Sequence, residues 1–160
     1  MNTIVQALSD LPREWIVIII AMLPLVELRG AIPVGVILGL PITETFLLSM
    51  LGNLLPIPFI LLLLNPLRRM ANSWPVVGPL LRWAEERAMK RRGAIDRHGF
   101  WGLLTFVGVP LPGTGAWTGA LIAVLLEMPL WRSLLAIVLG VVVAGVLIAL
   151  LSLAGLLALT

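Results

Sequence analysis

Two charged residues, Glu27 and Arg29, interrupt an apolar run that continues on both sides, from Trp15 to Val26 and from Gly30 to Thr43. A charge inside a bilayer is costly unless it is paired or hydrated, so ionisable residues in such runs are candidates for function. The carboxylate could carry a coupling proton, and the guanidinium could set the pKa of that carboxylate or bind an anionic group of a substrate. Two alternatives stay open: a structural ion pair at a bend of the chain, or two hydrated charges near the membrane surface.

A second candidate segment offers bare backbone in place of charge. Gly113 and Gly115 permit tight turns, the freed amides of a half-helix attract anions, and Trp117 adds a flat apolar wall. The spacing of Gly115 and Gly119 also fits close helix packing, which is the alternative explanation for these glycines. The candidate substrate and coupling residues of both segments are Glu27, Arg29, Gly30, Pro33, Pro110, Pro112, Gly113, Thr114, Gly115 and Trp117.

Catalytic chemistry has little support in the composition. The chain has no cysteine and one histidine, which excludes thiol catalysis and a multi-histidine metal site. The sequence also contains no Ser/His/Asp set, acidic pair or phosphate-binding loop. We therefore expect no enzyme activity, no catalytic residue, no metal and no cofactor.

The overall composition is that of an integral membrane protein. Of the 160 residues, 60% are hydrophobic and 12% are charged, and the mean hydropathy is +1.10. Soluble domains are about 45–50% apolar and about 25% charged, so a soluble fold of this size could not bury so much apolar surface. We expect one membrane domain over residues 1–160, with residues 1–14 as a short N-terminal segment.

Positive charge is concentrated in residues 65–98. Eight of the eleven basic residues and three acidic ones lie there, a balance of 8 − 3 = +5. A basic block beside apolar runs predicts a cytoplasmic loop and hence a multi-pass protein of the inner membrane. A nucleic-acid patch is the competing interpretation, and no nucleic-acid partner is expected. The spacing of Leu80, Leu81, Ala84 and Ala88 predicts an interfacial amphipathic helix. The basic residues are Arg68, Arg69, Arg82, Arg87, Lys90, Arg91, Arg92 and Arg97.

Two apolar stretches, Trp15–Leu40 and Gly99–Met128, are long enough to cross a bilayer but are broken in the middle. Pro24–Pro33 interrupts the first stretch and Pro110–Gly115 the second, since proline and glycine do not continue a straight helix. Each stretch is typical of a re-entrant hairpin, with two arms of about 9–12 residues that reach half of the hydrocarbon core. Two kinked full-length spans are the alternative.

Two unbroken segments, Thr45–Leu64 and Ser133–Leu159, meet the length of about 20 residues that a spanning helix needs. Asn53, Pro56 and Pro58 predict a kink in the first of them.

An internal repeat links the segments, because Pro24 and Pro112, Pro41 and Pro129, and Gly52 and Gly140 are each 88 residues apart. Each unit is a hairpin followed by a spanning helix and crosses the membrane once, so the second unit is inverted. We expect repeat 1 over residues 15–64, the basic connector over 65–98 and repeat 2 over 99–160. The fold class is therefore all-α integral membrane, with two inverted repeats.

The two candidate segments also resemble a known family. Glu27-Leu-Arg-Gly-Ala-Ile-Pro33, with Gly35 and Gly39-Leu-Pro41, resembles the signature of the putative small multi-drug export protein family. Pro110-Leu-Pro-Gly-Thr-Gly-Ala-Trp-Thr-Gly119 fits that family's second block. The resemblance extends from about Leu23 to the last helix and implies a small membrane exporter. The paired hairpins are also similar in architecture to DedA-like membrane proteins, although no DedA motif matches residue by residue.

We therefore expect a small transporter or exporter of small molecules, which a proton gradient could drive, with the substrate site between the two hairpin tips. A DedA-like lipid-carrier translocase and a non-transporting structural or assembly protein are the alternatives. The expected partners are membrane lipids, a small-molecule or lipid-phosphate substrate and, because so few helices make a thin wall, a second copy of the chain.

Overall fold

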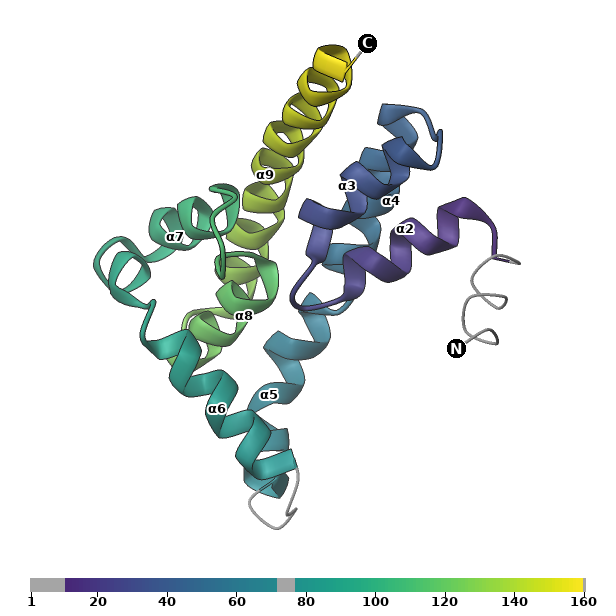
Figure 1. The fold of residues 1–160 in the computed structure, drawn as a ribbon. Helices are drawn as coiled ribbons and strands as arrows, with labels where there is room; N and C mark the ends of the chain where they lie inside the picture. The colour runs from purple at the N-terminus through teal and green to yellow at the C-terminus, as the bar shows by residue number, and fades with distance from the viewer. Residues whose placement is uncertain (1–10, 72–76, 160) are drawn as a thin grey trace.

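The computed structural model describes residues 11–71 and 77–159. Within these ranges every regular element is an α-helix, which confirms the all-α class. Figure 1 shows α9 lying between the group α2, α3 and α4 and the group α7 and α8. The helices are α2 (Arg13–Met22), α3 (Glu27–Ile37), α4 (Ile42–Leu54), α5 (Ile57–Ala71), α6 (Val77–Met89), α7 (Gly93–Gly108), α8 (Ala116–Leu125) and α9 (Leu130–Leu159).

Some residues of the predicted N-terminal segment and of the predicted connector are not described by the structure. Residues 1–10 of the N-terminal segment, residues 72–76 of the connector, and the side chains of Arg68, Arg69 and Leu80 lie outside the described residues. Within the connector, α6 confirms the predicted helix. Its Ala88 is buried while Arg82 and Arg87 are exposed, so this helix has one apolar side.

Short helices joined by tight turns form two hairpins. The arms α2, α3 and α8 have 10, 11 and 10 residues. The fourth arm, α7, has 16 residues, and Gly99 kinks it with φ 51° and ψ −117°. The second hairpin's first arm was predicted to begin at this glycine.

The first break in the sequence is narrower than predicted. Only residues 23–26 leave the helical conformation, and Pro33 lies inside α3. The fixed φ of proline is compatible with a helix. Because proline has no N–H, the helix lacks only the hydrogen bond to the carbonyl four residues earlier. Glu27 and Arg29 therefore belong to the first turn of α3 and not to a loop.

The ends of α3 and α8 are built alike. Each helix closes on a left-handed residue, Gly39 with φ 81° or Glu127 with φ 53°, and a proline follows two residues later. This is the geometry of a Schellman C-cap, which satisfies the last carbonyls of a helix. The closing bonds run from Leu40 N–H to the Gly35 carbonyl, 3.0 Å, and from Met128 N–H to the Ala123 carbonyl, 2.9 Å.

The 88-residue spacing also relates the long helices. α4 and α9 begin 88 residues apart, as α3 and α8 end 88 residues apart, and α5 follows α4 after two residues, so α4 and α5 together align with α9. The helix breaks at Leu55 and Pro56, because Pro56 has no N–H to donate. This break is the predicted kink. The corresponding part of α9 contains no proline and stays continuous.

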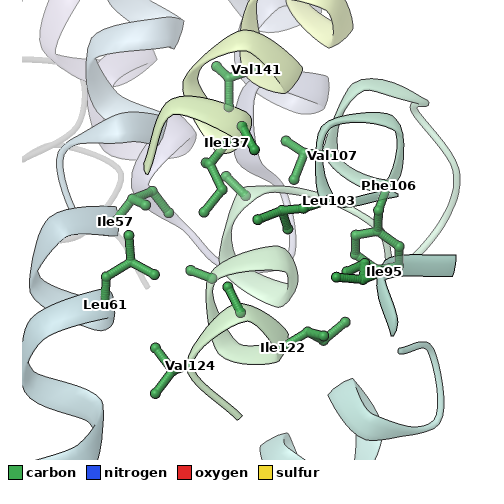
Figure 2. Packing of buried hydrophobic residues seen from close by; sticks show 14 of the residues in the cluster. Ile57, Leu61, Ile95, Leu103, Phe106, Val107, Ile122, Val124, Ile137 and Val141 are labelled. Atoms are coloured by element: carbon green, nitrogen blue, oxygen red, sulfur yellow. The ribbon is translucent and has the colours of Figure 1, made fainter. Parts of the chain in front are cut away.

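The main core surrounds α8, the most deeply placed helix of the second hairpin. Ile122 and Val124 of α8 belong to one buried cluster with Ile57 of α5, Leu103 of α7 and Ile137 of α9, which Figure 2 shows around this helix. A helix that is apolar all round suits such a position. A smaller cluster, formed by Val17, Ala21 and Ala31, fills the first hairpin.

The outer surface is strongly apolar. Leu25, Ile37, Leu47 and Phe59 are 91%, 83%, 64% and 59% exposed, and Leu150 and Leu151 continue this surface on α9. Apolar area on this scale indicates contact with lipid or protein. Two helical segments of the described chain, Ile42–Pro66 and Leu130–Gly155, are long and apolar enough to cross a membrane.

Gly52 of α4 should tolerate no side chain. A Cβ there would meet the Ile18 carbonyl and would lie 2.8 Å from the Ala21 Cβ, so we expect Gly52→Ala to destabilise the protein by about 1–3 kcal/mol. Thermal unfolding in detergent measures the loss. The control is Gly155→Ala on α9, where a Cβ meets nothing within 4 Å. Equal melting temperatures of the two variants would contradict this packing.

Candidate functional site

The Glu27 carboxylate is the most buried charged group among the described side chains. The residue is 4% exposed and has a left-handed backbone, φ 52°, and its side chain reaches the second hairpin. There the carboxylate accepts a hydrogen bond from the Trp117 backbone N–H, 3.2 Å from Oε1. The Ala116 N–H adds a weaker interaction.

The acceptor and these donors satisfy each other. The first N–H groups of a helix have no acceptor within the helix, and the helix dipole makes this end positive. Glu27 supplies that acceptor for α8 from the opposite hairpin. In return, α8 supplies donors to a carboxylate that has left water, which would otherwise be very costly.

Gly115 leaves room for this contact. Its φ is 137°, and a Cβ at this position would overlap the Glu27 carboxylate, 2.7 Å from the carboxyl carbon. No other residue type could bring its backbone so close to Glu27 at this φ.

Arg29 binds the same hairpin through side chain and backbone. Its Nη1 donates to the Leu111 carbonyl, and its Nη2 donates to Thr114 Oγ1 at 2.8 Å. The planar guanidinium presents these donors as a fixed fork, which a lysine could not do. The Thr114 hydroxyl in turn lies within hydrogen-bond distance of the Val109 and Leu111 carbonyls, 2.8 and 2.9 Å.

We call this contact between residues 27–29 and residues 109–117 the tip junction. It brings together Glu27, Arg29, Thr114, Gly115 and Trp117 of the predicted set. The two charges therefore bind the opposite hairpin in preference to forming an isolated ion pair.

Other predicted residues lie around the junction. Pro110 and Pro112 belong to the turn that Arg29 contacts, whereas Gly30 packs against Val26 of its own turn. Pro33 lies farther along α3, more than a helical turn from Glu27.

Arg91 is a contributor that the sequence did not single out. From the connector, its Nη1 donates to the Pro112 carbonyl at 2.6 Å, and a Cβ on Gly113 would lie 2.6 Å from its Cζ. In the sequence it is one of several basic residues in a row, and no local pattern distinguishes it. Leu111 and Ala116 were also missed, because they contribute backbone groups only.

An open apolar groove of about 500 Å³ lies beside the tip junction. Its lining comes from α7, between His98 and Phe106, and from Val109, Leu111 and Thr114. Leu111 and Thr114 are also the residues that bind Arg29. The tip junction therefore forms one end of the groove, while Glu27 itself is not part of the lining.

Comparison with protein families matches residues 27–147 to the putative small multi-drug export protein family. The chain belongs to this family. The match begins at Glu27, directly after the turn at residues 23–26, and contains the residues of the tip junction and α8. Neither the curated proteins nor the solved structures gave a match.

This small multi-drug export family member is therefore a membrane protein by family and by the apolar surface described above. What the family description leaves open is the substrate, the coupling ion and the role of each residue.

Gly115→Ala should disrupt the tip junction, because the new Cβ overlaps the Glu27 carboxylate and the φ is unsuitable for alanine. We expect a loss of about 1–3 kcal/mol, measured as a lower melting temperature in detergent. Gly93→Ala is the control, since a Cβ at Gly93 meets nothing within 4 Å.

A double-mutant cycle separates the overlap from the backbone effect. Combining Gly115→Ala with Glu27→Ala removes the overlapping carboxylate, so the double variant should be less destabilised than the sum of the single variants. Strictly additive losses would show that the two positions do not touch.

Proposed function

We propose that the protein is a proton-coupled exporter of small amphiphilic molecules, with Glu27 as the coupling carboxylate. The observation that carries this proposal is the position of the tip junction at one end of the apolar groove. The groove would hold the apolar part of a substrate, and Thr114 and Arg29 would meet its polar or anionic group. No covalent step is involved.

The contact between Glu27 and α8 suggests how a proton could drive the cycle. The charged carboxylate holds the N-terminus of α8 through the Trp117 N–H and the helix dipole. A proton on Glu27 removes the negative charge and weakens this attraction. The second hairpin could then move relative to the first and change the side from which the groove is reached.

We further propose that each hairpin is re-entrant and that the two repeats are inverted. Supporting this arrangement, arms of 10 or 11 residues rise only about 15–17 Å, half of the hydrocarbon core. The shared C-caps and the common 88-residue spacing of helix ends support a repeat. With the basic connector cytoplasmic, the protein would be a multi-pass protein of the inner membrane.

Two other functions compete with drug export. The groove is open at the molecular surface beside Trp101 and Leu111, which are 69% and 56% exposed, and this favours a lipid-carrier substrate lying partly in the bilayer. A second copy of the chain could close the groove. A purely structural protein is favoured by the hydrogen bonds that Glu27 and Arg29 already make to the opposite hairpin.

The Glu27→Gln variant tests the coupling. Glutamine keeps the size and an acceptor oxygen but cannot carry the proton, so the variant should insert at normal levels and lose proton-driven uptake. Uptake into inverted vesicles is measured with ethidium and with a fluorescent lipid phosphate. If the two charges only stabilise the fold, Glu27→Gln and Arg29→Gln should each lower the free energy of unfolding by about 3–5 kcal/mol and so reduce the yield of folded protein. The double variant should then regain that yield. Normal uptake by a well-expressed Glu27→Gln protein would end the coupling proposal.

Single cysteines test the inverted repeat. The protein has no native cysteine, and Thr43 and Leu130 are both exposed at the start of α4 and α9. In intact cells, an impermeant thiol reagent should label Thr43→Cys and leave Leu130→Cys unlabelled, because the two turns would lie on opposite sides. Glu44 and Arg132 beside them agree with the positive-inside rule. Equal labelling would exclude inversion.

A further inference from the structure

Three polar side chains follow one another along a buried face of α4. Thr45, Ser49 and Asn53 are each 0% exposed and are spaced by four residues, so they share one side of the helix. In the part of the chain that the structure describes, neither hydroxyl oxygen has a hydrogen-bond partner, and neither do Nδ2 and Oδ1 of Asn53. Buried polar groups are nearly always satisfied, by protein or by ordered water.

The second repeat shows that the fold itself does not require polar groups at these places. The residues 88 positions later, on α9, are Ser133, Ile137 and Val141, and all three are 0% exposed. Ser133 donates to the Pro129 carbonyl at 3.1 Å, and the other two are apolar. Buried apolar side chains therefore fit at the corresponding positions of α9, so packing alone does not explain the polar side chains of α4.

The packing of α3 against α4 gives the direction of this polar face. A Cβ on Gly35 would lie 2.9 Å from Thr45 Oγ1, which places Thr45 beside the C-terminal part of α3. The two helices run antiparallel through a short turn, and eight residues of each rise about 12 Å. Starting from Gly35 and Thr45, this rise brings Glu27 and Asn53 to the same level. The polar face thus extends from the α3–α4 turn to the level of the tip junction.

The spacing along this face suits water. Residues four apart on a helix rise by about 6 Å, and one water that makes two roughly tetrahedral hydrogen bonds of about 2.8 Å joins groups about 4.5 Å apart, so one or two waters bridge each step. A water at each step would satisfy the hydroxyls and the amide, as buried waters do in polar sites.

We propose that the buried face of α4 holds a single file of water that runs from the α3–α4 turn, past Thr45, Ser49 and Asn53, to the level of Glu27. The role of this file, which is to bring protons to Glu27, rests on the proposed function. The presence of the file does not.

Silver ions test for water at these positions, since Ag⁺ is small and reacts only with thiols that water reaches. In proteoliposomes, Ser49→Cys and Asn53→Cys should react with Ag⁺ at least about tenfold faster than the equally buried controls, because the α4 face is hydrated. The controls are Ile137→Cys and Val141→Cys, the corresponding positions of α9. The readout is loss of labelling by a fluorescent maleimide after unfolding. Equal protection of all four cysteines would overturn the water file.

A measurement on the unmodified chain avoids any folding defect of the variants. In water-edited solid-state NMR of the protein in bilayers, the Asn53 amide and the Ser49 Cβ should gain water magnetisation faster than Ile137 and Val141. Build-up of the Asn53 signal that is no faster than that of Val141 would also overturn the proposal.

The proton route and the transport function fail in different ways. Asn53→Leu should slow proton-driven uptake several-fold, whereas Ser133→Ala, which removes a hydroxyl that is bonded within α9, should leave it unchanged. If Glu27→Gln abolishes uptake while the NMR signal of Asn53 shows no contact with water, the coupling proposal stands and the water file is wrong. If Ser49→Cys and Asn53→Cys react with Ag⁺ but the protein moves neither probe, the water file stands and the proposed function is wrong.

Discussion

The arrangement of the two hairpins depends on a buried carboxylate that sits on the end of a helix. Glu27 has left water, and α8 begins with N–H groups that have no acceptor within the helix. Each would be costly alone, and together they satisfy each other. This contact fixes where α8 begins, requires glycine at 115, and brings the turn that Arg29 binds within reach. The core around α8 then packs against α5, α7 and α9.

In the proposed inverted repeat, the two halves of the chain meet at a pair of corresponding positions. Glu27 and Gly115 are 88 residues apart, the spacing that relates the helix ends, and they are in direct contact. In a molecule with two-fold pseudosymmetry, only positions close to the axis touch their own counterparts. The largest chemical difference between the halves, a carboxylate against a bare backbone, therefore lies where the two frames approach most closely. The first half supplies the charge of Glu27, and the second half supplies the dipole of α8.

The sequence predicted what local patterns encode. Turn prolines and glycines gave the hairpin arms, and Pro56 with Pro58 gave the break between α4 and α5. Pro33 was placed in a break because a proline within a helix has no sequence signature that distinguishes it from a turn. The partners across the tip junction could not be predicted, since Arg29 and Arg91 bind backbone carbonyls, which every residue has. Asn53 was read only as a source of the kink, and its burial without partners needed the packing of α4.

The break between α4 and α5 makes the halves mechanically unequal. Pro56 and Pro58 leave the carbonyls of Gly52 and Leu54 without their helical hydrogen bonds, so α5 can swing about the end of α4 at low cost. α9 is a single helix of 30 residues and has no such joint. Because α5 packs on α8, a swing of α5 would carry α8 and the second tip with it. α9 is thus the continuous helix of the molecule and α4–α5 the interrupted one, and the interruption lies within a few residues of Asn53.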